Sequence, residues 1–306
     1  MLHAREGAVS AEPGSRSTRK DADGHLNLTL LLATARKAAR QAGNVQMQHF
    51  GNGTPVLIHN PAHDLKLDTD QASETVICSV IQSRLPDHAI VSEESGFQGK
   101  ASRYVWIIDP LDGTVNYYFG LPFFCTSVAC YCSPVPISDG LEFRDVYVSG
   151  RCEPLVGVVY APFFDWMFCA AAGQGATWDG LPLRNSQDMG LEDALVGISF
   201  GSRPAVIEQM GYLATALAQH AKKIRMFGAT GLDLAQVAKG AITALVQLHV
   251  NIWDFAAAQL ILSESGVLFE TLPNCCRGWC ILAAPRSLLQ PLKSIVHGAL
   301  SEKFFI

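Results

Sequence analysis

Residues 105–114 read V-W-I-I-D-P-L-D-G-T, and this stretch says most about how the chain folds and what it binds. The apolar run Val105 to Ile108 predicts a buried strand that ends on Asp109, turns through a proline and is followed by Asp112. Two carboxylates at the end of a buried strand are unfavourable unless a cation binds them. Mg²⁺ takes oxygen ligands and keeps positions open for phosphate oxygens, which the following Gly-Thr step is suited to hold. The stretch therefore predicts a metal-dependent site that handles phosphate.

The bulk composition indicates a globular protein with a large core. The chain has 306 residues, of which 49% are hydrophobic and 17% are charged, enough for one large domain or two of ordinary size. Its formal net charge of -5 argues against a general nucleic-acid binder, so we expect no DNA partner. An acidic balance is compatible with a carboxylate cluster whose charge a metal cancels.

The cysteines and the start of the chain indicate a reduced, cytoplasmic protein. The nine cysteines are scattered, and several lie in apolar runs, which is typical of cysteine used as a small hydrophobic residue. The cluster Cys275-Cys276-x-x-x-Cys280 lacks a second pair at zinc spacing. No signal-peptide core and no run of about 20 apolar residues is found, so we expect no membrane partner.

The order of the predicted elements favours an α/β (α+β) fold in two parts. Residues 1–26 are predicted to be a flexible extension, 27–188 an α+β half and 189–306 an α/β half. The first half predicts an antiparallel sheet, with helices at 27–50 and 69–85 and strands at 89–91, 105–108, 126–131, 155–160 and 166–170. The second half alternates strands at 195–200, 241–250 and 267–270 with helices at 205–221, 231–239 and 254–265.

Further acidic residues occur at the ends of other predicted elements. Glu93 and Glu94 follow a short apolar run, Asp64 and Asp70 precede a helix, and Asp254 opens a later helix. Taken singly, each has an ordinary interpretation as a surface loop residue, a solvated side chain or a helix N-cap. The prediction of a binding site depends on the set.

These motifs resemble those of the inositol monophosphatase family, in the superfamily of lithium-sensitive, Mg²⁺-dependent phosphatases with the fructose-1,6-bisphosphatase-like fold. The resemblance covers about residues 28–300. The motifs that carry it are Glu93-Glu94-Ser95, Asp109-Pro110-Leu111-Asp112-Gly113-Thr114-Val115-Asn116-Tyr117 and Trp253-Asp254-Phe255-Ala256-Ala257. It implies a layered αβαβα sandwich, with an antiparallel sheet in the first half and a mixed sheet in the second. It also implies a homodimer.

The resemblance implies a role for each acidic residue. Two or three Mg²⁺ ions would be held by Glu93, Asp109, the Leu111 carbonyl, Asp112 and Asp254. The implied catalytic residues are Asp70, Thr114 and Glu93, with Thr114 and Asp70 orienting the attacking water. The implied substrate contacts are Asp112, Gly113, Thr114, Gly228, Thr230, Gln247 and Asp254. The implied reaction is hydrolysis of a phosphate monoester of a small polyol or sugar, by water that two metal ions activate.

The substrate side departs from the family pattern. His59 stands where relatives commonly have lysine, Leu67 where they have threonine, and Gln247 where inositol phosphatases usually have glutamate. The loop 228–231 reads Gly-Ala-Thr-Gly rather than Gly-Ser/Thr-Ala-Ala. Histidinol phosphate, fructose bisphosphate and adenosine 3',5'-bisphosphate therefore stay open as substrates. A regulatory, RNA-associated interaction protein that retains the fold is the alternative from another class.

Overall fold

The computed structural model describes residues 27–51, 57–59, 65–138, 143–201, 203–272 and 279–304. The predicted extension at 1–26, Asp64, Cys275 and Cys276 lie outside these residues. Within them, no helix is long and apolar enough to cross a membrane. The seven described cysteines are all free thiols.

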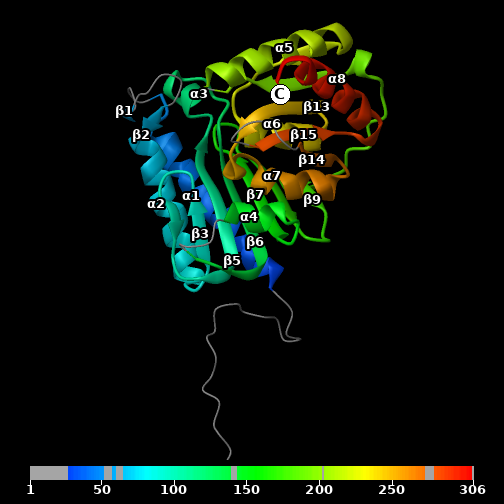
Figure 1. Cartoon of the computed structure of the whole chain (residues 1–306). Helices are drawn as coiled ribbons and strands as arrows, with labels where there is room; N and C mark the ends of the chain where they lie inside the picture. The colour runs from blue at the N-terminus through cyan, green and yellow to red at the C-terminus, as the bar shows by residue number, and fades with distance from the viewer. Residues whose placement is uncertain are drawn as a thin grey trace, which may run out of the picture.

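Two sheets form the frame of the molecule (Figure 1). The first has eight strands in the order β10-β9-β8-β7-β6-β5-β3-β4, all antiparallel except the β3–β5 pair. Its strands are β3 (Ala89–Ser92), β4 (Gly96–Gln98), β5 (Ser102–Asp112), β6 (Cys125–Ile137), β7 (Glu153–Ala161), β8 (Trp166–Ala171), β9 (Ala176–Trp178) and β10 (Leu181–Leu183). A separate pair, β1 (Leu57–His59) with β2 (Lys66–Leu67), precedes it.

The second sheet is mixed, as predicted. Its order is β12-β11-β13-β15-β14, parallel through the first three strands and antiparallel through the last three. Its strands are β11 (Leu195–Ser199), β12 (Lys223–Arg225), β13 (Ala244–Val250), β14 (Leu268–Leu272) and β15 (Trp279–Ala284).

Three layers of helices alternate with the two sheets, which confirms the predicted αβαβα sandwich (Figure 1). Helices α1 (Leu28–His49) and α2 (Asp68–Arg84) cover the outer face of the first sheet. Helices α6 (Thr230–Lys239) and α7 (Ile252–Ser265) lie between the sheets, and α5 (Pro204–His220) and α8 (Arg286–Phe304) cover the second sheet. The shorter helices are α3 (Thr114–Tyr118), α4 (Phe143–Val148) and the 3-10 turn η1 (Leu191–Asp193). Buried residues lie on every side of α7, as expected for a helix between two sheets.

Strand β5 is longer than the sequence predicts. The prediction ended the apolar run at Ile108 and the strand on Asp109, with a turn through Pro110, but β5 continues to Asp112. Asp109 pairs with Ser127 and Asp112 with Cys125, so three steps along β5 oppose two along β6. This is a β-bulge, which bends a strand and changes the direction of its side chains. The bulge therefore brings both carboxylates to the same end of the sheet.

The predicted boundary at residue 188 lies between β10 and η1. Elements from both sides of it contribute to the core between the sheets, which includes Val159, Leu234 and Phe255. The division into two halves stays a prediction.

The packing of α7 on the first sheet depends on a glycine. A Cβ added at Gly157 in β7 would lie 2.3 Å from the carbonyl oxygen of Ala257, an atom fixed in the helix backbone. We expect Gly157→Ala to lower the free energy of unfolding by about 2 kcal/mol or more, within or above the range for overpacked cores. Urea denaturation would measure the change. Gly211→Ala in α5 is the control, because no atom lies within 4 Å of its added Cβ and alanine favours a helix. Equal stability of the two variants would contradict the expected clash.

Candidate functional site

Four acidic side chains from three elements lie near one another where β5 ends. Asp109 and Asp112 come from β5, Glu93 follows the neighbouring strand β3, and Asp254 is in the first turn of α7. Since β3 and β5 are parallel, with Ser92 beside Ile108, the residues that follow them emerge at the same edge. The structure thus places side by side four residues that the sequence predicted as one set.

Asp109 and Glu93 are the most closely coupled pair. Asp109 is 2% exposed, and its Oδ1 accepts the N–H of Leu111 at 3.1 Å. Burial raises the pKa of Asp109 well above its usual value, and the Glu93 and Asp112 carboxylates raise it further. Burial, followed by repulsion from Asp254 and Glu94, does the same to the pKa of Glu93. A cation bound between the two carboxyl groups would relieve this repulsion.

Asp112 faces the N-terminus of α6. Its Oδ1 accepts the Thr230 N–H at 3.0 Å and its Oδ2 accepts the Gly231 N–H at 2.7 Å. The partial positive charge of a helix N-terminus stabilises a carboxylate there. Burial raises the pKa of Asp112 to about 6, while these hydrogen bonds lower it. The bonds join the end of the first sheet to the helix layer between the sheets.

Asp254 belongs to a reciprocal capping box at the start of α7. The N-cap is Asn251, and Asp254 is the N3 residue, whose Oδ2 accepts the Asn251 N–H at 2.7 Å. The helix begins at Ile252, two residues before the predicted start. Burial raises the pKa of Asp254 to about 8, and repulsion from Asp112 contributes. The local structural role of Asp254 and its place among the acids coexist, because only one of its oxygens is used in the cap.

Asp70 and Thr114 approach each other beside the acidic set. Asp70 is 3% exposed, its Oδ2 accepts the Leu67 N–H at 2.7 Å, and its Oδ1 lies 3.3 Å from Thr114 Oγ. The Thr114 hydroxyl also lies 2.9 Å from the Leu111 carbonyl oxygen, so it can donate to either acceptor. Burial raises the pKa of Asp70 to about 7, and Glu94 raises it further. A carboxylate with a pKa near neutrality is suited to accept a proton.

The donor set fits a hard divalent cation. Of the ion pairs between described residues, none involves Glu93, Asp109, Asp112 or Asp254, so these acids have no lysine or arginine to neutralise them. Buried carboxylates without such a partner are unfavourable, and oxygen ligands are those that Mg²⁺ prefers. Nevertheless, no three His, Cys, Asp or Glu side chains in the described ranges converge into a ready-made ligand cluster. Both oxygens of Asp112 and one oxygen of Asp254 accept N–H groups at helix N-termini, so a cation would have to use the remaining lone pairs of these carboxylates.

The predicted substrate residues lie around the start of α6 and α3. Gly113 has φ 90°, and a Cβ there would lie 3.0 Å from the Phe123 carbonyl oxygen, so a glycine is required. Gly228 also has positive φ, and the Asn116 amide beside it donates to the Phe227 carbonyl at 2.6 Å. This bond holds the loop that carries Gly228 against α3.

Gln247 is tied to Thr230. The Thr230 hydroxyl donates to Gln247 Oε1 at 3.0 Å, and both residues are 8% exposed. The Gln247 amide N–H groups therefore remain available to donate to a substrate. On the other side of the site, Leu67 is fully buried, whereas the family pattern has a threonine.

Three residues that support the site were not identified from the sequence. The Gln46 amide of α1 donates to the Pro110 carbonyl at 2.7 Å and to Thr126 Oγ at 2.8 Å, which holds the bulge of β5 from behind. The Cys125 thiol lies 3.4 Å from Asp112 Oδ2. Asp233 in α6 is 1% exposed, and burial and Asp112 raise its pKa well above the usual value. The only sequence signal for Gln46 and Asp233 is a polar residue on the apolar face of a predicted helix.

Comparison with known proteins shows which family the chain matches. The sequence model of the family described as "Inositol monophosphatase family" matches residues 27–138 and 146–302. The intervening residues 139–145 include the start of α4.

Curated relatives and solved structures agree with this match. "Nus factor SuhB" of Haemophilus influenzae is 32% identical over 280 residues, covering 90% of this chain and 98% of the relative. The crystal structure of the extragenic suppressor protein suhB from Bartonella henselae is 26% identical, with a TM-score of 0.75, and covers 91% of this chain and 100% of that chain. The structure of inositol monophosphatase from Anabaena (Nostoc) sp. PCC 7120 is 29% identical, with a TM-score of 0.69, and covers 90% of this chain and 97% of that chain.

Proposed function

The chain belongs to the inositol monophosphatase family, and on that premise we propose that it is a Mg²⁺-dependent phosphatase of small polyol or sugar phosphates. The observation that carries the proposal is the set of four acids at the end of β5, of which Asp109 and Asp112 are buried and Glu93 and Asp254 are half-buried. No lysine or arginine of the described chain pairs with any of them. Such a set suits a site that is completed by divalent cations and by the phosphate they attract.

The metal ligands proposed are Glu93, Asp109, the Leu111 carbonyl, Asp112 and Asp254. Mg²⁺ bound there would make a water nucleophilic near neutral pH and stabilise the oxygen that leaves the phosphorus. The contact of Asp70 Oδ1 with Thr114 Oγ supports a role for this pair in orienting that water. Asp70, with its pKa of about 7, would then accept the proton at Oδ1. The N–H groups of Gly113 and Thr114 are proposed to hold the phosphate.

The leaving alcohol would lie beside Thr230 and Gln247. The Gln247 oxygen accepts the Thr230 hydroxyl, and the Gln247 amide also offers N–H donors, which a glutamate in this position would lack. A neutral donor there fits a sugar or polyol hydroxyl acting as acceptor. It equally fits a more polar leaving group such as histidinol, a second phosphate or a nucleotide.

A panel of phosphate monoesters tests the proposal. We expect release of inorganic phosphate from at least one of inositol 1-phosphate, histidinol phosphate, fructose 1,6-bisphosphate and adenosine 3',5'-bisphosphate in the presence of Mg²⁺. Addition of EDTA should remove the activity, and excess Mg²⁺ should restore it. Inactivity on every substrate at saturating Mg²⁺ would contradict the proposal.

The names of the relatives favour a second candidate function. Several curated relatives, including that of Haemophilus influenzae, are named Nus factors, so an interaction role could accompany or replace hydrolysis in this chain. Inactivity on the whole panel by a protein that still binds Mg²⁺ would favour this role.

A further inference from the structure

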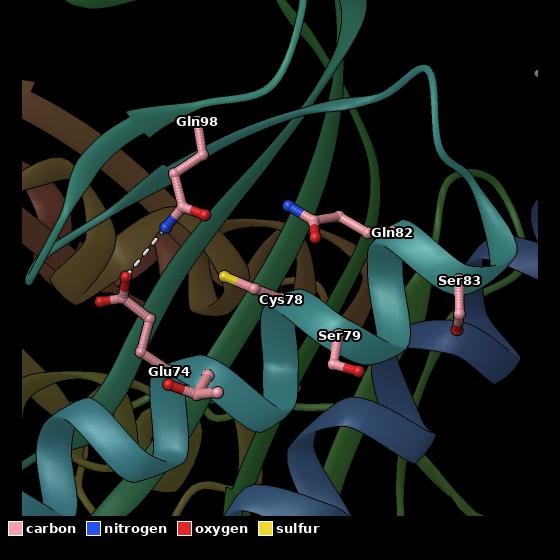
Figure 2. A pocket seen from close by; sticks show the side chains of 7 residues that line it. Glu74, Cys78, Ser79, Gln82, Ser83 and Gln98 are labelled. Carbon is pink, nitrogen blue, oxygen red and sulfur yellow. Dashed lines mark hydrogen bonds between the residues drawn. The ribbon is translucent and has the colours of Figure 1, made fainter.

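Glu74 is a buried carboxylate one helical turn after Asp70 on α2. It is 6% exposed, and none of the ion pairs within the described residues includes it. Its Oε2 accepts the Ser92 hydroxyl at 2.7 Å, and its Oε1 accepts the Gln98 amide at 2.9 Å and the Ser95 hydroxyl. Figure 2 shows the Glu74 and Gln98 side chains meeting across the space between α2 and β4.

The three donors all belong to the segment that carries Glu93. Ser92 ends β3, Ser95 lies in the turn and Gln98 ends β4, so Glu93 and Glu94 are bracketed by residues bonded to Glu74. Strand β4 is at the edge of the eight-stranded sheet and pairs only with β3. Apart from Glu74, the hairpin is held by the pairing of β3 with β5 and by the ion pair between Glu94 and Lys66 at 3.1 Å. Hydrogen bonds to a charged acceptor are about twice as strong as neutral ones, which suits them to this purpose.

A hollow lies beside Glu74, but no ligand in it is needed to explain why this carboxylate is buried. Its volume is about 600 Å³, and Glu74 is the only charged residue among the described residues that line it. The other side chains drawn in Figure 2 are neutral, and both Glu74 oxygens already accept hydrogen bonds from the hairpin.

We propose that Glu74 is a positioning residue that sets the place of the Glu93 carboxylate beside Asp109 by binding Ser92 and Ser95. The inference rests on the proposed function. One helix then positions two parts of the site: Asp70 reaches Thr114 from its first turn, and Glu74 fixes the metal-binding hairpin from its second. Glu74 itself touches neither metal nor substrate.

The test measures metal binding without turnover. Electron paramagnetic resonance of free Mn²⁺ would give the dissociation constant of the full-length wild type and of Glu74→Ala. We expect the constant to rise about 10- to 100-fold, the usual effect of removing a residue that orients a metal ligand. Glu74→Gln should give an intermediate value, because its amide keeps one acceptor. The Mg²⁺ concentration for half-maximal activity should rise in parallel, while kcat at saturating Mg²⁺ should fall less than about threefold.

Two further variants separate positioning from general stability. Gln82 lines the same hollow as Glu74. The variant Gln82→Ala should therefore bind Mn²⁺ like the wild type. Ser92→Ala removes one hydrogen bond of Glu74, so it should weaken Mn²⁺ binding less than Glu74→Ala does. If Glu74→Ala does not fold, Ser92→Ala can be measured in its place. If Glu74→Ala bound Mn²⁺ as the wild type does, the positioning role of Glu74 would be overturned, while the proposed function would stand. The same holds for Ser92→Ala if it is the only one of the two variants that folds. Failure of the wild type to bind Mn²⁺ would overturn the proposed function together with the positioning role.

Discussion

Asp109→Asn is expected to abolish Mg²⁺-dependent phosphate release while leaving the protein folded. The amide keeps the size of the side chain and can still accept the Leu111 N–H, but it removes the charge that faces Glu93, Asp112 and Asp254. We expect a fall in kcat/KM of more than about 100-fold, because even the loss of a group that only orients a metal ligand has effects of 10- to 100-fold. Steady-state kinetics on the substrate found with the panel would measure it.

The same variant should not lose stability in EDTA. Its thermal midpoint should equal or exceed that of the wild type, because one of the mutually repelling buried carboxylates has gone. Asp193→Asn is the matched control, since Asp193 is exposed and pairs with Lys222 far along the chain from the acidic set. Near wild-type turnover by Asp109→Asn would show that the assignment of the site is wrong.

Removal of the metal is expected to make stability fall as the pH rises. Burial raises the pKa of Asp112, Asp70 and Asp254 from 3.8 to about 6, 7 and 8 in the folded protein. Between pH 4 and 8 the folded state therefore binds more protons than the unfolded state, and the free energy of unfolding must decrease with pH. Each such group contributes up to about 1.4 kcal/mol per pH unit within its own window. Thermal unfolding in EDTA from pH 5 to 8 would measure the decrease.

Mg²⁺ should reverse this trend. Because the cation competes with protons for the same oxygens, its stabilising effect should be small at pH 5 and large at pH 8. In the Asp109→Asn variant the Mg²⁺ effect at pH 8 should be greatly reduced. An EDTA-treated wild type whose midpoint rises from pH 5 to 8 would show that these acids do not hold their protons in the folded state.

The elements that the sequence predicts well are those whose signal is local. Helix α1 was predicted at 27–50, and the Asn27 side chain at its start accepts the Leu30 N–H at 2.8 Å, as an N-cap residue does. The central strands were found because buried strands read as short apolar runs between turn residues. Strands β9 and β10, with three residues each, are not among the predicted strands, and α8 was not predicted at all. Pro291 inside α8 is a signal against a helix.

The parts of the site that were not predictable depend on contacts between distant residues. Asp-Pro after an apolar run resembles a turn, and β5 continues through it where Gln46, 64 residues away, binds the Pro110 carbonyl. The bonds from Asp112 to Thr230 and Gly231 span 118 and 119 residues. No local pattern encodes them. The presence of the acids in one place was predictable from the motifs, but the direction in which each carboxylate points was not.

The hydrogen bonds of Asp112 have a consequence for how such a protein could change over evolution. Asp112 binds the Thr230 N–H, and the Thr230 hydroxyl binds Gln247, so the proposed metal ligand and the proposed specificity residue are joined through one intermediate. The two bonds use different parts of Thr230, the backbone N–H for Asp112 and the side-chain hydroxyl for Gln247. A substitution of the Thr230 side chain would release Gln247 and keep the N–H that Asp112 accepts. The alcohol end of the site can therefore change by mutation at Thr230 and Gln247 while the phosphate end keeps its support.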